Sequence, residues 1–220
     1  IDNPIIKLSE IKSWISKKNK FFFLKIMIIP LSKLKDWNYN SKNITHKNKK
    51  HFSIIGVKIN TNKREVNEWY QPILKGKNLA ISGFLIKEFN QTKHYLCRYI
   101  LKPGLRNGVL SCTVNSSDLK NYKKDKNLNL FQKKTIGNYF LSNKFKKYKI
   151  YENIMSDEGG RFFHCQIRYI GFLLKENFKI ILPSNYIWIS HNQMINLIKD
   201  KKVDIETRLL FGSININKLK

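Results

Sequence analysis

The chain has 220 residues, a hydrophobic content of 42% and a formal net charge of +27. Its length suits one large domain or a tight pair of small ones, and its apolar content is enough for a packed core. A membrane-spanning helix needs about 18 consecutive apolar residues, and the sequence contains no such run, so no membrane association is expected.

The basic residues are mostly lysines, spread along the chain beside many Asn and Ile residues. This mixture favours a solvated Lys-rich surface over a dedicated polyanion-binding surface, because lysine is a poorer bidentate partner for phosphate than arginine. The cysteines Cys97, Cys112 and Cys165 lack the spacing of a metal site, and their odd number indicates a reducing compartment. We therefore expect a cytoplasmic protein without a structural metal.

The first half of the chain predicts a helix followed by several strands. The helix is expected over residues 9–20, with Ser9 as its N-cap. Residues 21–29 are strongly apolar and predict a buried strand that ends at Pro30, and residues 31–37 predict a short helical turn. Further strands are expected over residues 52–59, 79–87, 93–102 and 110–115, with a hairpin turn at residues 90–92.

The second half begins with a Lys- and Asn-rich excursion over residues 121–147, which is either a surface loop or a helix carrying Leu130, Ile136 and Phe140. The remaining elements are expected as strands at 161–170 and 178–182, a helix at 191–199 capped by Ser190, and an extended segment at 203–211. Many short strands with three or four helices predict the α+β class. Because neither a flexible linker nor an internal repeat is visible, a single domain over residues 1–220 is predicted.

Two stretches far apart in the chain combine charged, aromatic and glycine residues at high density. The first reads R-E-V-N-E-W-Y-Q-P-I at residues 64–73, and the second reads S-D-E-G-G-R-F at residues 156–162. Arginine, tryptophan and glutamine bind phosphates and rings, and adjacent glycines allow a backbone to approach a ligand closely. Both stretches are therefore candidates for a binding site.

With other motifs in the same order, these stretches resemble the NDP-hexose 2,3-dehydratase family of deoxysugar biosynthesis. The other motifs are S-W-I at 13–15, I-P-L at 29–31, F-S-I-I-G-V at 52–57, G-F-L at 83–85, L-S-C-T-V at 110–114 and T-R at 207–208. The resemblance implies a Nudix-like mixed β-sheet flanked by helices, as a single repeat unit. Since members usually hold two such units in tandem, the chain is interpreted as one half of a longer enzyme or as a single-unit relative that forms a homodimer.

The resemblance also implies a reaction on a nucleotide-linked 4-keto-6-deoxyhexose, with dTDP as the expected nucleotide. A base removes the C3 proton, an acid assists loss of the C2 hydroxyl, and the enol relaxes to a 3,4-diketo-2,6-dideoxyhexose. This chemistry needs no cofactor or metal. The product is labile, so a downstream 3-ketoreductase is an expected partner.

The candidates for proton transfer are carboxylate, imidazole and phenol groups in or near the motifs. Glu158 is the best-placed carboxylate because two glycines follow it. Asp157, His164 and Tyr122 are the other catalytic candidates, with acid and base not assigned among them. His94 follows a predicted turn and is interpreted as structural.

The candidates for nucleotide and diphosphate binding are Arg161, Arg168, Trp69, Gln71 and Asn121. The two guanidinium groups can each grip a diphosphate or form an internal salt bridge. The indole can stack on a nucleobase or pack in the core. The glutamine can hydrogen-bond sugar or base, and the asparagine can donate to phosphate or belong to a surface turn.

Several positions depart from the family pattern. Ile100 and Lys102 replace a lysine and a glutamate, and His164 begins a run that is usually more basic. These replacements favour an alternative in which the unit is catalytically inactive and serves as a nucleotide-binding or dimerisation repeat. A basic nucleic-acid-binding module is a third hypothesis from charge alone, but the sequence carries no signature of one, and nucleic acid is disfavoured as a partner.

Overall fold

The computed structural model describes residues 2–49, 51–76, 78–117, 131–142, 145–175, 177–179 and 181–216. The chain divides into two compact units, and each is described here by itself. The large unit comprises Ile1–Ile26, Ile81–Asn153 and Arg168–Lys220, and the small unit comprises Met27–Ala80 and Ile154–Ile167. A single 2,3-dehydratase-type domain over the whole chain stays a prediction.

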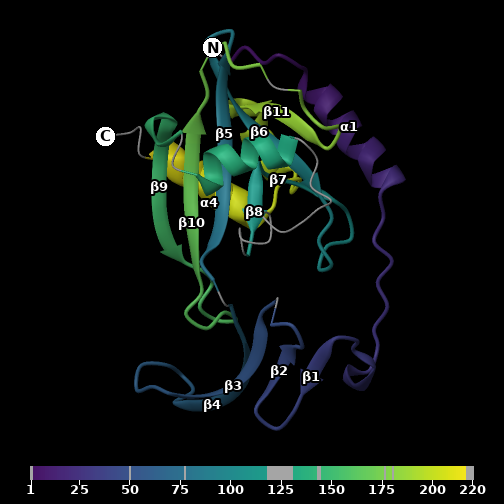
Figure 1. Ribbon diagram of the computed structural model, residues 1–220, viewed down its shortest axis with the longest axis vertical. Helices are drawn as coiled ribbons and strands as arrows, with labels where there is room; N and C mark the ends of the chain where they lie inside the picture. The colour runs from purple at the N-terminus through teal and green to yellow at the C-terminus, as the bar shows by residue number, and fades with distance from the viewer. Residues whose placement is uncertain are drawn as a thin grey trace. The chain divides into compact units, whose positions relative to one another are not determined.

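A seven-stranded sheet forms the centre of the large unit, with the order β11-β6-β5-β10-β9, β7 beside β6 and β8 beside β5 (Figure 1). Its strands are β5 (Ala80–Phe89), β6 (Thr92–Ile100), β7 (Val109–Cys112), β8 (Val114–Ser116), β9 (Lys149–Ser156), β10 (Gln166–Leu173) and β11 (Tyr186–Ser190). The expected hairpin between β5 and β6 is confirmed. Asn90 and Gln91 both have positive φ, 50° and 61°, as a tight two-residue hairpin turn requires.

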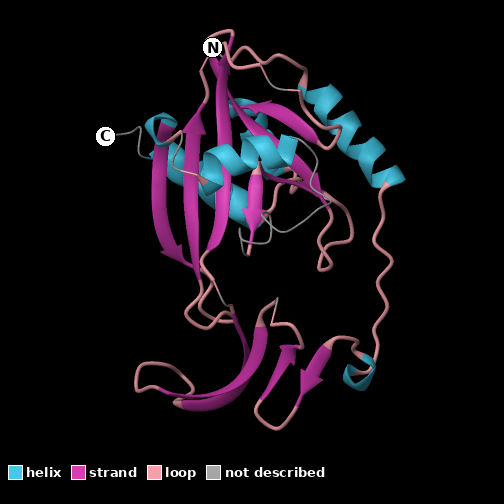
Figure 2. Cartoon of the chain, in the orientation of Figure 1, coloured by secondary structure: helices cyan, strands magenta, loops and turns pink. Residues whose placement is uncertain are grey.

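The large unit also contains the helical elements α1, η2, η3, α3 and α4 (Figure 2). Their bounds are α1 Leu8–Phe21, the π-helix η2 Gln132–Leu141, the 3₁₀ turn η3 Lys146–Tyr148, α3 His191–Lys199 and α4 Ile205–Ile216. Ser190 caps α3 as predicted, because its Oγ accepts the Gln193 N–H at 3.4 Å while Gln193 Oε1 accepts the Ser190 N–H at 3.0 Å. None of the described helices is long and apolar enough to span a membrane.

Two glycines allow helical side chains to approach the large sheet closely. A Cβ at Gly83 on β5 would lie 2.2 Å from the ring of Phe140 on η2, and a Cβ at Gly171 on β10 would lie 3.0 Å from Ile214 on α4. Ile136 and Phe140 are buried in the same apolar cluster as Trp188. The helix alternative for the Lys- and Asn-rich excursion is therefore right for its described part, whereas Leu130 lies outside the described residues.

The small unit is built on a four-stranded antiparallel sheet with the order β1-β2-β3-β4. Its elements are the 3₁₀ turn η1 (Leu31–Lys33), β1 (Trp37–Tyr39), β2 (Asn43–His46), β3 (Ser53–Asn60) and β4 (Glu68–Lys75). β3 and β4 pair along their full lengths, from Ser53 opposite Lys75 to Asn60 opposite Glu68. The loop between them carries the first half of the R-E-V-N-E-W motif to one end of this hairpin.

The α+β class is confirmed, but several predicted elements are wrong. Residues 22–29 form no strand and are exposed, although their apolar sequence predicts a buried one. The predicted extended segment at 203–211 is largely helix α4, because Asp204 Oδ1 accepts the Thr207 N–H at 3.1 Å and so caps the first turn. The described residues of 178–182 form no strand.

The boundaries of the first two elements also differ from the prediction. Helix α1 begins at Leu8 rather than after Ser9, because Glu10 Oε2 reaches back to accept the Lys7 N–H at 2.7 Å. The helical turn predicted over residues 31–37 is limited to η1, and Trp37 already belongs to β1.

Candidate functional site

The two motif stretches that stand out in the sequence lie side by side in the small unit. The Leu74 N–H of β4 donates to the Arg161 carbonyl at 2.8 Å, and the Phe163 N–H donates to the Leu74 carbonyl at 2.7 Å. Leu74 and Phe162 form a parallel bridge. This pairing brings the Gly159-Gly160 turn to the strand that carries Trp69 and Gln71.

Two successive side-chain hydrogen bonds also join the two stretches. Trp69 Nε1 donates to Gln71 Oε1 at 2.8 Å, and Gln71 Nε2 donates to the Gly160 carbonyl at 2.8 Å. The indole N–H can only donate and the carbonyl can only accept, so both partners require the same orientation of the amide. Both ends of Gln71 are thus engaged within the protein, and this side chain acts as a clamp between β4 and the glycine turn.

The clamp forms part of a groove with a volume of about 620 Å³. The lining comes from β3, β4, the loop between them and the second motif stretch: Val57, Lys58, Ile59, Thr61, Arg64, Trp69, Gln71, Ile73, Gly159, Gly160 and Phe163. The groove combines an indole, a phenyl ring, two cationic side chains and a glycine turn. Such a surface suits a ligand that has both a ring and negative charge.

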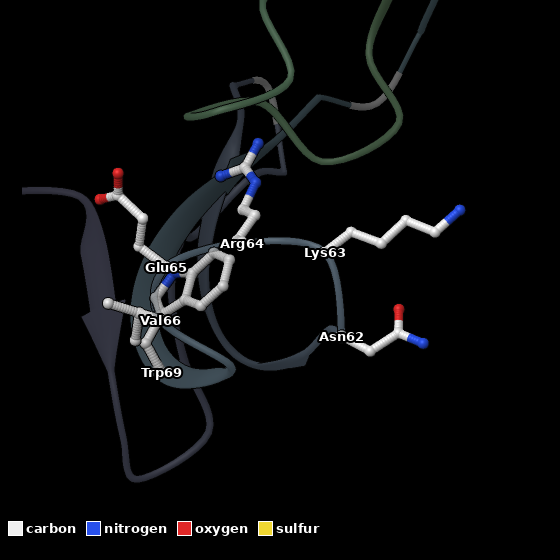
Figure 3. A pocket seen from close by; sticks show the side chains of 6 residues that line it. All are labelled: Asn62, Lys63, Arg64, Glu65, Val66 and Trp69. Atoms are coloured by element: carbon white, nitrogen blue, oxygen red, sulfur yellow. The ribbon is translucent and has the colours of Figure 1, made fainter.

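Arg64 lies over the Trp69 ring, with 5.7 Å between the guanidinium carbon and the ring centroid. Figure 3 shows the two side chains together at the end of the β3–β4 hairpin, with Glu65 and Val66 beside them. A second hollow of about 670 Å³ opens on this loop and shares both residues with the groove. The contact between this guanidinium and the indole is a feature of the groove that the sequence analysis did not predict.

Glu158 and Arg161 form an ion pair beside the groove. Arg161 Nε donates to Glu158 Oε2 at 2.6 Å, and the Gly160 N–H donates to Glu158 Oε1 at 2.8 Å. The hydrogen bond from Arg161 is the main cause that lowers the pKa of Glu158 below its ordinary value. The arginine side chain is 80% exposed, and a guanidinium has five N–H donors, so it keeps capacity for a further anion.

Asp157 and His164 flank this pair. Asp157 Oδ1 accepts the Glu158 N–H at 2.8 Å, and the Asp157 N–H donates to the Cys165 carbonyl at 2.9 Å. His164 is exposed, has a positive φ of 51°, and contacts Phe163 edge-on with 4.2 Å between ring centroids. Asp157, Glu158 and His164 thus lie in one short segment of the small unit, as their positions in the sequence already require.

Arg168 has a different environment, on β10 in the large unit. It pairs with Glu152, which also binds Lys149, and the three residues line a hollow of about 210 Å³. The hydrogen bond from Lys149 is the main cause that lowers the pKa of Glu152, and Arg168 adds to it. These contacts favour the internal salt bridge as the present state of Arg168, while its binding to nucleotide stays a prediction. Asn121 and Tyr122 lie outside the described residues.

His94 is structural, as the sequence suggested. Its ring is buried, with Nδ1 at 2.8 Å from the Thr92 carbonyl, and Nε2 accepts the Ile5 N–H at 3.3 Å. These partners fix the tautomer with the proton on Nδ1. Burial lowers the pKa of His94, so the ring is held neutral between two backbone groups. Among the described residues, no group of three or more His, Cys, Asp or Glu is placed to share a metal ion.

Lys102, one of the positions that depart from the family pattern, forms ion pairs with two carboxylates. Lys102 Nζ lies 3.0 Å from Asp204 Oδ2 and 2.7 Å from Glu206 Oε2, and the aspartate side chain is only 2% exposed. The Cys112 N–H donates to Thr207 Oγ1 at 2.6 Å in the same region. These contacts join the start of α4 to the sheet. They could not be predicted from local sequence patterns, because the partners are separated by about a hundred residues.

The strands and helices place the chain in the α+β class, with a groove of aromatic and cationic side chains in its small unit. Comparison with known proteins identifies the family. The sequence profile of NDP-hexose 2,3-dehydratases matches residues 8–214. The chain belongs to the NDP-hexose 2,3-dehydratase family.

Two relatives of this chain are dTDP-4-dehydro-6-deoxy-alpha-D-glucopyranose 2,3-dehydratases. The protein from Saccharopolyspora spinosa is 26% identical over 213 residues, which cover 94% of this chain and 42% of the relative. The protein from Amycolatopsis orientalis is 25% identical over 213 residues, which cover 94% of this chain and 43% of the relative. The chain thus spans less than half the length of these relatives.

Among solved structures, a crystal structure of an ADP compounds hydrolase is similar to this chain with a TM-score of 0.44 and 9% sequence identity. The similarity covers 77% of this chain and 87% of the hydrolase. A likeness of this size carries no conclusion about the site.

Proposed function

We propose that this chain is a sugar-nucleotide-binding unit of a 2,3-dehydratase that acts on a dTDP-linked 4-keto-6-deoxyhexose. The observation that carries this proposal is the convergence of residues 64–73 and 156–162 on one groove, in a chain that belongs to the dehydratase family. The relatives are dehydratases of a dTDP-linked sugar, which supports dTDP as the nucleotide.

In this proposal the groove holds the nucleotide by its ring and its charge. The Trp69 indole, with Arg64 over one part of it, offers a flat surface for the base. Arg161 supplies donors for the diphosphate while its Nε–H remains on Glu158. Gln71 positions these groups without contacting the ligand, which revises its predicted role as a hydrogen-bonding partner of sugar or base.

Glu158 is the base in this proposal. Arg161 lowers its pKa, so the carboxylate stays ionised and cannot serve as the resting acid. The same contact makes it a weaker base toward the C3 proton. The acid that assists loss of the C2 hydroxyl is then one of the remaining candidates, Asp157, His164 or Tyr122. The reaction so written needs no cofactor, and its diketone product requires a ketoreductase to follow.

A second candidate function is nucleotide binding without turnover. It is favoured by the exposure of Glu158 on the surface and by the use of Lys102 in an internal ion-pair network. In this case the unit contributes binding or assembly, and another unit contributes the catalytic groups.

Calorimetric titration with dTDP tests the binding proposal directly. We expect saturable binding with a defined stoichiometry at low and high salt, and at least ten-fold weaker binding by Trp69→Ala at an unchanged melting temperature. Ile181→Ala is a matched control, since this side chain is 94% exposed and belongs to the large unit. Absence of dTDP binding by the folded wild-type chain would refute the proposal.

Turnover is tested separately with the 4-keto-6-deoxyhexose substrate and a coupled ketoreductase. Turnover that Glu158→Gln removes, with dTDP affinity unchanged, supports the assignment of the base. Binding without turnover supports the second candidate function.

A further inference from the structure

The Arg64 side chain occupies the indole surface on which a nucleobase would stack. Its guanidinium carbon lies over the Trp69 ring at 5.7 Å from the centroid, within the range of a cation–π contact. Both side chains line the groove as well as the second hollow (Figure 3). A guanidinium and a base on the same face of one indole exclude each other, because each needs contact with the same ring atoms.

The guanidinium of Arg64 is held in this place by a weak contact. Within the described residues of the small unit, the ion pairs do not include Arg64. Figure 3 shows the side chains of Arg64 and Glu65 pointing apart, although the residues are adjacent. Arg64 is exposed, and a cation–π contact at an exposed site is weak, so a ligand can displace the guanidinium at small cost.

The backbone of the loop that carries Arg64 is better fixed than its side chain. The Thr61 N–H donates to the Asn67 carbonyl at 2.9 Å and closes the loop. The Lys63 N–H donates to Thr61 Oγ1 at 3.3 Å. The guanidinium can therefore leave the indole by rotation about side-chain bonds alone, while the loop stays in place.

A nucleotide on the indole would bring its phosphates within reach of the displaced guanidinium. Gln71 binds both Trp69 Nε1 and the Gly160 carbonyl at 2.8 Å, so the glycine turn borders the ring on one side. Arg64 already reaches the ring from the β3–β4 loop. A guanidinium that leaves the indole for a phosphate exchanges a weak contact for paired, charge-assisted hydrogen bonds.

We propose that Arg64 is a gate that restricts the groove to phosphorylated nucleosides. The base displaces the guanidinium from Trp69, and the freed guanidinium binds a phosphate of the same ligand. A nucleoside without phosphate must displace the same guanidinium and receives no compensating contact, so its affinity is lowered. The inference rests on the proposed nucleotide-binding function and adds the means by which the groove selects its class of ligand.

Titration of the wild-type chain and Arg64→Ala with dTDP and with thymidine tests the gate. The substitution should weaken dTDP binding about ten-fold, because a charge-assisted contact to phosphate is lost. It should strengthen thymidine binding about two- to five-fold, because the competing cation–π contact is gone. Lys63→Ala is the matched control. It removes the same charge from the neighbouring residue, which lines the second hollow but not the groove, and both affinities should stay within about two-fold of wild type.

The Nε–H resonance of Arg64 gives a second measurement on the wild-type chain. Protons close to the face of an aromatic ring are shielded, so this resonance should move downfield when dTDP or thymidine displaces the guanidinium. The conservative variant Arg64→Lys assigns the signal by removing it. A resonance that stays in place while dTDP binds would overturn the gate.

The two ligands together separate the gate from the proposed function. Opposite changes of dTDP and thymidine affinity in Arg64→Ala support the gate. Changes of the same sign for both ligands, or no change for either, overturn the gate but leave the proposed function standing if the wild-type chain binds dTDP. A folded wild-type chain that binds no dTDP refutes the proposed function, and the gate with it.

Discussion

The clamp formed by Gln71 gives the sharpest prediction for the groove. Its amide accepts from Trp69 Nε1 at 2.8 Å and donates to the Gly160 carbonyl at 2.8 Å. The substitution Gln71→Leu removes both hydrogen bonds at nearly constant volume. Each hydrogen bond contributes a net stabilisation of about 1 kcal/mol. The variant therefore loses about 2 kcal/mol of the free energy that holds the indole against the glycine turn. If that positioning is needed for binding, the dTDP dissociation constant rises about 30-fold.

The substitution Gln71→Glu separates positioning from packing. At neutral pH the introduced carboxylate still accepts from the Trp69 indole, but its other oxygen faces the Gly160 carbonyl with no proton between them. We expect affinity at least as weak as in Gln71→Leu. When the introduced carboxyl is protonated, it regains a donor for the carbonyl, and binding relative to wild type should recover as the pH falls below about 5.

Calorimetric titration with dTDP across this pH range provides the assay. Each variant is compared with the wild-type chain at the same pH, because the phosphates of the ligand also titrate. Glu158 remains ionised through most of this range, since Arg161 lowers its pKa. A Gln71→Glu variant that binds dTDP as tightly as wild type at neutral pH, or that shows no recovery in acid, would refute the clamp.

Other predictions concern the stability of the large unit. Lys102→Met should lower the free energy of unfolding by about 2 kcal/mol in a urea titration, because it leaves the buried Asp204 without its cation. Burial lowers the pKa of Lys102, but hydrogen bonds and charges of its carboxylate partners raise it more. The contribution is therefore present at neutral pH and lost only as the pH rises through a value above 10.5. Gly83→Ala should cost about 1–3 kcal/mol, because its Cβ would lie 2.2 Å from Phe140. Gly137→Ala is the control: nothing lies within 4 Å of its Cβ, and it should be neutral or stabilising in the same titration.

The ion pair between Glu158 and Arg161 has a consequence for the proposed chemistry. A base and a diphosphate-binding group that contact each other are coupled, so a phosphate bound by Arg161 alters the carboxylate that removes the proton. Arg161→Lys should weaken dTDP binding and also raise the pKa that governs turnover, because lysine offers a point charge in place of a forked donor. A change in affinity with no change in the pH profile of turnover would contradict this coupling.

Local patterns in the sequence predicted those elements whose stabilising contacts are also local. The α3 helix has its capping residues three positions apart, and the β5–β6 hairpin has its turn residues adjacent, so both are visible in a short window. The same holds for the motifs at residues 64–73 and 156–162, whose residue types alone indicated a binding site. Family membership also follows from sequence, because ordered motifs extend along nearly the whole chain.

Tertiary structure decided those features that depend on contacts between residues far apart in the chain. The apolar residues 22–29 have the sequence of a buried strand, but a strand is buried only where a sheet accepts it, and in this chain they are exposed. Helix α4 begins where Asp204 caps it, and Lys102 neutralises that aspartate from far along the chain. The ion pair has no signature in local sequence, because hydrophobic periodicity does not report ion pairs between distant segments. The Asp204 cap is local, since its partner Thr207 lies three residues away, and the prediction of an extended segment overlooked it.

The groove shows the same division between sequence and structure. The sequence determined that an indole, an amide, an arginine and a pair of glycines occupy two short stretches, and it thereby determined the chemistry available. Only the fold decided that the two ends of the Gln71 amide bind Trp69 and Gly160 and so join β4 to the glycine turn. The physical reason is that a hydrogen bond between residues 89 positions apart depends on how strands pair, and pairing is set by the whole sheet.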